Sequence, residues 1–402
     1  MASNYGLLCI FCFLRPIFSI STFVRYDIAG VTLNEMFGIG SSYLFLILFI
    51  INIRKIRFDF IAVNIFFLCA YILGSVIWGA GLREVVRLVL PFTVFFVARS
   101  TITDERKFRN IILCLVLGFI VPVISSAVIT LQGLGINQVI FQTGIARYKG
   151  VYANVHSLAH SMFICLFILV VYIGMGQNKT KFMTLAIAAI GIMAFYNIYK
   201  SYTRTVYVGL AVFLLVYLWG RRKYHLLAVS AVVMVLIVAL SSTFQVIFFD
   251  IVDPIAGRTN TFKEMGSGRL GGWEKIFRNF MNAPPEIQIR GLGMGDQTTI
   301  TIGADFGGAH NDFLAMLLIF GFIGLAIYIT YNGALLLNIL FSRLDRNLRS
   351  AAFGFVASVI AMNLLSNSYL TRFELGQYFN LIMGMFLGLS EATPAKETVS
   401  GT

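Results

Sequence analysis

The sequence IILCLVLGFIVPVISSAVIT occupies residues 111–130, directly after the basic cluster Arg106-Lys107-Phe108-Arg109. This stretch contains no charged residue. As an α-helix, about 20 apolar residues cross the roughly 30 Å hydrocarbon core of a bilayer, and a helix satisfies its backbone polar groups within the segment. Residues 111–130 therefore predict a membrane-spanning helix that begins beside a charged connection.

Similar apolar stretches recur along all 402 residues of the chain. Hydrophobic residues make up 58% of the sequence, charged residues make up 12%, and the mean hydropathy is +0.84. Soluble domains hold roughly 25% charged residues, so this composition excludes a water-soluble enzyme and a disordered protein. It predicts an all-α, polytopic membrane protein with about twelve transmembrane helices. The approximate spans are 5–20, 36–53, 59–79, 88–100, 111–130, 155–175, 182–199, 205–219, 226–249, 313–341, 350–370 and 377–390. The first, fourth, eighth and twelfth are short or polar, which gives a range of ten to twelve.

Alternate connections between these spans are short and basic. They contain Arg54-Lys55-Ile56-Arg57, Arg106-Lys107-Phe108-Arg109, Lys179-Thr180-Lys181, Arg221-Arg222-Lys223, and Arg343 with Arg346 and Arg349. Short loops rich in Lys and Arg mark the cytoplasmic side of a membrane, so both termini are predicted to be cytoplasmic. Most of the net charge of +13 follows from this orientation, and no nucleic-acid partner is expected.

One predicted outer connection, residues 250–309, is much longer than the others. Loops of this length in compact proteins are usually functional. The loop divides the chain into nine spans in 1–249, three spans in 310–391 and a cytoplasmic tail in 392–402.

Within this loop, four apolar residues follow the spacing of one helix face: Trp273, Ile276, Phe277 and Phe280. The spacing predicts a short amphipathic helix that lies on the outer leaflet. A purely structural lid helix is the alternative interpretation.

His310 is a candidate general base, because it lies where the large loop meets the N-terminus of the tenth predicted span. The positive end of a helix dipole disfavours the imidazolium form, so the imidazole can be neutral and accept a proton. Asn311 and Asp312 follow directly and are close enough to orient it, which makes Asp312 a second catalytic candidate. The alternative interpretation is a helix-capping turn that carries an interfacial histidine.

Several arginines are predicted on the outer side, against the charge bias of the other connections. Those that could bind phosphate are Arg147, Arg204, Arg269 and Arg290. A guanidinium group offers a planar fork to phosphate oxygens and stays charged when partly buried. The alternative is that each arginine anchors its segment at the membrane interface.

His156 and His160 have a helical i, i+4 spacing that two metal ligands could use. No carboxylate lies near them in sequence, so no metal site is predicted. The chain also contains no P-loop, HExxH, GxSxG or DxD motif. Their absence weighs against a nucleotide-hydrolysing pump, a zinc protease and a metal-dependent sugar-nucleotide transferase.

Five short motifs follow one another between Gly150 and Gly324. They are Gly-x-Tyr-x-Asn-x-x-Ser-Leu-Ala (Gly150 to Ala159), Thr203-Arg204-Thr205, Ser-Gly-Arg-x-x-x-Trp (Ser267 to Trp273), Gly-Leu-Gly-x-Gly (Gly291 to Gly295), and His-Asn-Asp-Phe-Leu with a following Gly-x-x-Gly (His310 to Gly324). In this order of motifs, over roughly residues 145–330, the chain resembles the O-antigen ligase and O-antigen/exopolysaccharide polymerase family of bacterial envelopes. The span count and the position of the large loop resemble that family as well.

The resemblance implies a multi-span glycosyltransferase that needs no metal and no other cofactor. Such an enzyme takes a glycan from an undecaprenyl diphosphate carrier on the periplasmic face of the bacterial inner membrane and joins it to an acceptor sugar. By position in the motifs, His310 corresponds to the histidine proposed to activate the acceptor hydroxyl. Arg204 and Arg269 correspond to arginines proposed to bind the diphosphate, whereas Arg147 and Arg290 are added from their placement alone.

The implied partners are an undecaprenyl-diphosphate-linked oligosaccharide and an acceptor glycan, with membrane lipid, a chain-length regulator and a flippase beside them. The leading hypothesis is a polymerase that joins lipid-linked repeat units into O-antigen, capsule or exopolysaccharide. A ligase that moves finished polymer to lipid A-core differs only in its acceptor. A transporter or flippase of polyprenyl-linked sugar is the third hypothesis, and the long outer loop with its histidine favours chemistry over transport.

Overall fold

The computed structural model describes residues 4–22, 27–28, 31–78, 81–140, 145–176, 180–240, 269–293, 311–366, 369–370 and 372–393. The α-helices are α1 (Asn4–Phe18), α2 (Leu33–Ile51), α3 (Phe60–Gly74), α4 (Leu82–Thr101), α5 (Glu105–Leu131), α6 (Val155–Gly174), α7 (Lys181–Ser201), α8 (Arg204–Gly220), α9 (Tyr224–Leu240), α11 (Arg269–Met281), α12 (Pro285–Arg290), α14 (Asp312–Leu340), α15 (Arg346–Leu365) and α16 (Phe373–Ala392). Short 3₁₀ helices cover Ser19–Thr22, Ile53–Lys55 and Ser75–Trp78. Two antiparallel hairpins pair β1 (Asp27–Ile28) with β2 (Val31–Thr32) and β3 (Ile136–Ile140) with β4 (Ile145–Tyr148).

Each of the twelve predicted spans overlaps one α-helix, from α1 to α9 and from α14 to α16. Within the part of the chain that the structure describes, six helical segments are long and apolar enough to cross a membrane, namely Phe60–Ile77, Glu105–Leu131, Val155–Gly174, Lys181–Ser201, Asp312–Leu340 and Arg346–Leu365. Shorter apolar helices cover Asn4–Phe18, Met36–Ile51 and Arg204–Gly220. The all-α membrane architecture is therefore confirmed, the number of spans stays a prediction, and the two hairpins are an addition that the sequence analysis did not predict.

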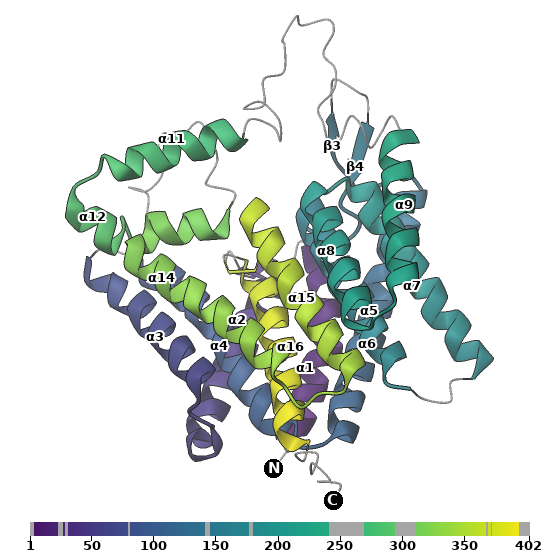
Figure 1. The fold of residues 1–402 in the computed structure, drawn as a ribbon, viewed down its shortest axis with the longest axis horizontal. Helices are drawn as coiled ribbons and strands as arrows, with labels where there is room; N and C mark the ends of the chain where they lie inside the picture. The colour runs from purple at the N-terminus through teal and green to yellow at the C-terminus, as the bar shows by residue number, and fades with distance from the viewer. Residues whose placement is uncertain are drawn as a thin grey trace, which may run out of the picture.

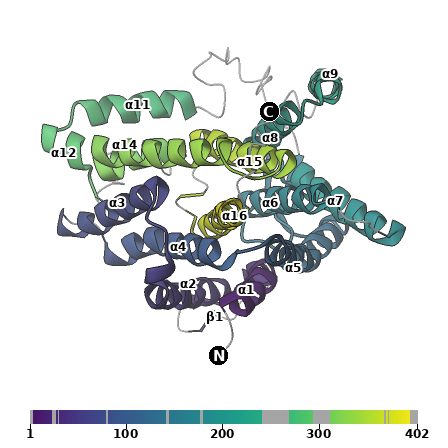
Figure 2. The same ribbon diagram turned by 60° about the horizontal axis from the view of Figure 1, so that its bottom comes forward.

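Helix α16 lies at the centre of the bundle, with other helices around it (Figure 1, Figure 2). Every residue from Leu375 to Ser390 is buried. Gln377 Nε2 donates to Ser42 Oγ at 2.7 Å, and Asn380 Nδ2 donates to a backbone carbonyl at 2.9 Å. These polar side chains make the span look doubtful in the sequence. In the structure they are buried against other parts of the protein and form hydrogen bonds there, as polar groups within membrane proteins usually do.

Helices α16 and α4 approach each other through small residues. A Cβ atom at Gly384 would lie 2.3 Å from the carbonyl oxygen of Phe95, and one at Gly388 would lie 2.5 Å from the carbonyl oxygen of Arg99. Residues four positions apart share one helix face, and small residues with this spacing allow helix backbones to pack closely in membranes. The close contact between α4 and α16 therefore depends on these two glycines.

Four of the five connections that the sequence predicts as cytoplasmic, those before α3, α5, α9 and α15, lie together at one end of the bundle. This end, here called the basic end, comprises the starts of α3, α5, α9 and α15 and the end of α16. Arg99 Nη1 donates to Asp59, the residue before α3, at 3.0 Å, and Arg99 Nε donates to Glu391 in α16 at 2.9 Å. Arg346 in α15 donates to the Gly220 carbonyl in α8 at 2.9 Å. The opposite end, here called the loop end, comprises the starts of α6, α8, α14 and α16 and carries the β3–β4 hairpin and α11 (Figure 1). This sorting agrees with the predicted alternation, and the side that faces the cytoplasm stays a prediction.

Helix α14 bends at Gly321, where the backbone has φ 67° and ψ −168°. The prediction of one continuous helix over 313–341 is therefore wrong. The bend frees the carbonyl of Ile319, which accepts a hydrogen bond from the N–H of Gly293 at 2.9 Å. A Cβ atom at Gly291 would lie 2.2 Å from the same carbonyl oxygen, so the Gly-Leu-Gly motif permits the segment after α12 to pair with the bend.

Helix α11 covers the loop segment for which the spacing predicts an amphipathic helix. Ile276 and Phe280 are buried in a small cluster with Leu317 and Leu318 of α14, while Phe277 is 48% exposed. The predicted placement on the outer leaflet therefore does not account for the whole apolar face of α11, because Ile276 and Phe280 pack against α14.

We expect Gly384→Ala to destabilise the purified, detergent-solubilised protein by about 1–3 kcal/mol, because the added methyl group overpacks the contact with α4. The measurement is the thermal unfolding midpoint. Gly333→Ala in α14 is the matched control, since a Cβ atom there meets nothing within 4 Å. Equal midpoints for the two variants would contradict the close α4–α16 contact.

Candidate functional site

The N-termini of four helices meet at the loop end. Thr203, the N-cap of α8, donates from Oγ1 to the first carbonyl of α6 at 3.4 Å. Arg372, the N-cap of α16, donates from Nη1 to Oδ1 of Asn154, the N-cap of α6, at 3.3 Å. The N–H of Leu370, just before α16, donates to Oδ2 of Asp312 at the start of α14 at 3.2 Å. These contacts link the starts of α6, α8, α14 and α16.

This convergence makes the loop end electropositive. A helix N-terminus carries about half a positive charge and presents N–H groups without partners in the helix. Four such termini, with arginine as the first residue of α8 and as the N-cap of α16, form a favourable environment for an anion with several oxygens. A phosphate or diphosphate group has this chemistry.

Arg204 is half-buried at the start of α8, and Arg147 from β4 supports the turn that precedes it. Arg147 Nε donates to the carbonyl of Ser201 at 3.1 Å, and its Nη2 donates to the carbonyl of Tyr202 at 3.5 Å. Tyr202 ends α7 in the left-handed conformation, with φ 48°. A cation at a helix C-terminus is favourable for the dipole, so Arg147 stabilises the turn between α7 and α8 and lies next to Arg204 in the fold.

Arg372 is a site residue that the sequence analysis missed. Besides Asn154, its Nη1 contacts Ser157 Oγ at 3.4 Å, and both residues belong to the Gly150–Ala159 motif. Burial lowers the pKa of Arg372, and the carboxylates of Asp312 and Glu374 oppose that shift. The side chain is thus a cation held among the four helix N-termini. The signal that could have found it is the same as for Arg204, a basic residue in a predicted outer connection.

Asp312 and Asn311 hold the start of α14. Asp312 is fully buried and accepts from the Leu370 N–H. Asn311 Oδ1 accepts from the Leu314 N–H at 3.0 Å, and its Nδ2 donates to the Leu364 carbonyl at 2.8 Å. This is the capping turn that the sequence analysis left as an alternative. His310 lies outside the described residues, so its role as a base and the orienting role of Asp312 stay predictions.

The two remaining arginines differ in position. Arg269 is the first residue of α11, and its side chain lies outside the described part of the structure. Arg290 ends α12, is exposed, and has Nη2 at 4.0 Å from Glu286 Oε2. Figures 1 and 2 place α12 on the opposite side of the bundle from α8. The structure therefore does not bring Arg290 to the turn that carries Arg204.

Residues 189–329 match the model of a known family, described as O-antigen ligase. This segment of the chain is similar to the O-antigen ligase family. The match supports the resemblance to this family, and the matched segment holds four of the five motifs, from Thr203-Arg204-Thr205 to His310–Gly324. Members of the O-antigen ligase family are enzymes that transfer glycans, and the apolar helices agree with a bacterial membrane protein. No curated protein matches the chain.

The O-antigen ligase segment runs from α7 to α14 and includes Arg204, Arg269 and His310. Arg147 and Arg372 lie outside it, and the fold brings them to the same end as the start of α8. Within the described part of the chain, no group of three or more His, Cys, Asp or Glu side chains could hold a metal ion. The loop end therefore combines arginines from inside the matched segment with arginines from outside it.

Arg147 holds the turn between α7 and α8, so Arg147→Gln should raise the amide hydrogen exchange rate of residues 199–204. We expect an increase of about fivefold, because the variant loses roughly one charge-assisted hydrogen bond. Lys149→Gln is the control, since the Lys149 N–H bonds to the Gly135 carbonyl through the backbone alone. Unchanged exchange in Arg147→Gln would contradict the capping role.

Proposed function

We propose that the loop end binds the diphosphate of a polyprenyl-linked glycan and that the protein joins such repeat units into O-antigen, capsule or exopolysaccharide on the periplasmic face of the bacterial inner membrane. The convergence of four helix N-termini with Arg204 and Arg372 is the observation that carries the proposal. The similarity to the O-antigen ligase family supports it, because members of that family transfer glycans.

The proposed reaction has a balanced course. The acceptor hydroxyl oxygen bonds to the anomeric carbon of the donor sugar while the bond from that carbon to the diphosphate oxygen breaks. The electron pair of the broken bond leaves with the polyprenyl diphosphate, and the hydroxyl proton passes to His310. Cations placed where negative charge grows stabilise the transition state, which is the role proposed for Arg204, Arg269 and Arg372.

An apolar cavity of about 830 Å³ supports a donor with a hydrocarbon tail. It lies between α6, α7 and α8, and Phe167, Phe195 and Phe213 are among its lining residues. The same α6 and α8 begin at the electropositive loop end. A ligand with a diphosphate head and a polyprenyl tail would use both features.

The description of the matching family favours a ligase as a second candidate. A ligase transfers finished polymer to lipid A-core, so it shares the donor and differs in the acceptor. The glycan phenotype of a deletion strain separates the two. Single repeat units on lipid A-core identify a lost polymerase, whereas long polymer left on the lipid carrier identifies a lost ligase.

His310→Ala should reduce glycan transfer by at least about 100-fold, because a general base contributes roughly 10²–10⁴-fold to the rate. Transfer is measured as polymer formed when the variant complements a deletion strain, together with membrane abundance of the protein. His225→Ala, in an exposed residue of α9 at the basic end, is the control. Normal polymer from His310→Ala would refute the assignment of the base.

Arg204→Lys and Arg372→Lys should each lower transfer by about 10-fold or more, since a point charge replaces a planar fork for phosphate oxygens. Arg278→Lys is the matched control, because Arg278 pairs with Glu274 at 2.8 Å on the exposed face of α11. Full activity of both test variants, at normal abundance, would mean that these arginines do not bind the diphosphate.

A further inference from the structure

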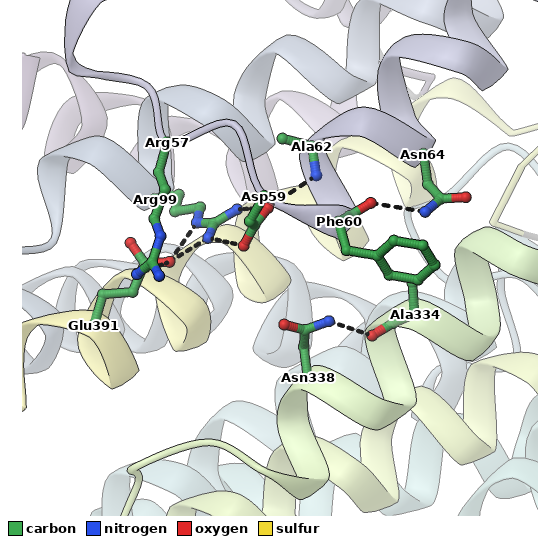
Figure 3. A network of polar contacts seen from close by, with 9 residues as sticks. All are labelled: Arg57, Asp59, Phe60, Ala62, Asn64, Arg99, Ala334, Asn338 and Glu391. Atoms are coloured by element: carbon green, nitrogen blue, oxygen red, sulfur yellow. Dashed lines mark hydrogen bonds and ion pairs between the residues drawn. The ribbon is translucent and has the colours of Figure 1, made fainter. Parts of the chain in front are cut away.

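A second charged site lies at the basic end, at the other end of the bundle from the proposed glycan site. Figure 3 shows Arg57, Asp59, Arg99 and Glu391 close together at this site. Arg99 is 7% exposed and binds both Asp59 and Glu391. Arg57 Nη1 lies 3.9 Å from Glu391 Oε1. A cavity of about 300 Å³ opens at this cluster, where α4, α14 and α16 end and α3 begins.

The walls of this cavity hold one more cation than anion. Arg57, Arg99 and Arg343 line it together with the two carboxylates. Arg99 already binds both carboxylates, and no acidic side chain among the described residues lies within ion-pair distance of Arg343. A bound anion between Arg57 and Arg343 would balance the charge of the cavity.

A buried hydroxyl in the cavity wall points to the same ligand. Ser342 is 8% exposed, and its Oγ has no hydrogen-bond partner in the described part of the chain. The neighbouring Arg343 N–H donates to Ser390 Oγ at 3.0 Å, which fixes the backbone at the edge of the cavity. Buried polar groups are normally hydrogen-bonded, and a phosphate oxygen is an acceptor that Ser342 could use.

Large apolar side chains surround this polar cavity. Phe341 is 78% exposed, Phe60 is 59% exposed and Leu337 is 52% exposed. Phe60 begins α3, and Leu337 and Phe341 at the end of α14 line the cavity itself. Free phosphate would use only the polar half of this surface, whereas an anion that carries acyl chains would use both halves.

We propose that the crevice between α3 and α14 at the basic end binds an anionic phospholipid, with the lipid phosphate between Arg57 and Arg343. Basic pockets between transmembrane helices recognise anionic lipid head groups by this chemistry. The bound lipid would lie beside the ion pairs by which Arg99 joins α4 to α16 and to the residue before α3. The site is independent of the proposed glycan transfer.

Native mass spectrometry of the full-length, detergent-purified protein tests the proposal. Phosphatidylglycerol and phosphatidylcholine are offered at equal concentrations, and the wild type should retain phosphatidylglycerol at least about 10-fold better. Each basic contact to an anionic lipid contributes about fivefold, so Arg57→Gln combined with Arg343→Gln should weaken retention by roughly 25-fold. Arg222→Gln removes one positive charge from the exposed α8–α9 connection at the same end and should change retention by less than about twofold on the same scale.

Three results would overturn the proposal. Equal retention of the two lipids would exclude recognition of the anion. If Arg222→Gln weakened retention as much as the double variant does, the net positive charge of the protein, and not this site, would explain the binding. Displacement of phosphatidylglycerol by inorganic phosphate would mean that a free anion is the ligand. If the double variant melts at a lower temperature, Ser342→Ala decides the question, since it keeps every arginine. A loss of about threefold supports the site, and unchanged retention contradicts it.

Discussion

The ion pairs of Arg99 at the end of the buried helix α16 are the interaction on which the rest of the bundle depends. At the basic end, Arg99 of α4 binds Glu391 of α16 together with Asp59. At the loop end, Arg372 lies in the field of Asp312 at the start of α14. Removing one partner of a buried ion pair leaves an uncompensated charge at high cost. The position of α16 along α4 is therefore set by this ion pair at the basic end and by the close packing of Gly384 and Gly388 against α4.

The direction of the helices links this architecture to the proposed chemistry. In an alternating bundle, every second helix begins at the same end, and α6, α8, α14 and α16 all begin at the loop end. Their N-termini contribute positive potential there whatever the side chains are. Arg204 and Arg372 stand at two of these starts, so charge from side chains and charge from backbone dipoles add at one place. This combined positive charge is the basis of the proposed diphosphate site.

Much of the fold could be predicted because the membrane imposes the length of its helices. Apolar runs of the required length coincide with α1 to α9 and α14 to α16. The prediction was doubtful for α1, α4, α8 and α16. In α16, Gln377 and Asn380 lower the hydropathy, while Gln377 donates to Ser42 of α2 and Asn380 accepts from Tyr331 of α14. The prediction was wrong about the continuity of α14, since the bend at Gly321 depends on a segment after α12 that supplies backbone hydrogen bonds.

The sequence by itself determined the membrane class, the positions of the helices, the sorting of basic connections to one end and the family, because these depend on local composition and motif order. Only the tertiary structure decided which cations meet. Arg372 and Asn154 lie 218 positions apart, and Arg147 reaches the turn before Arg204, while Arg290 stays with Glu286 on the other side of the bundle. Such contacts follow from helix packing, and no local pattern encodes the distance between residues on different helices.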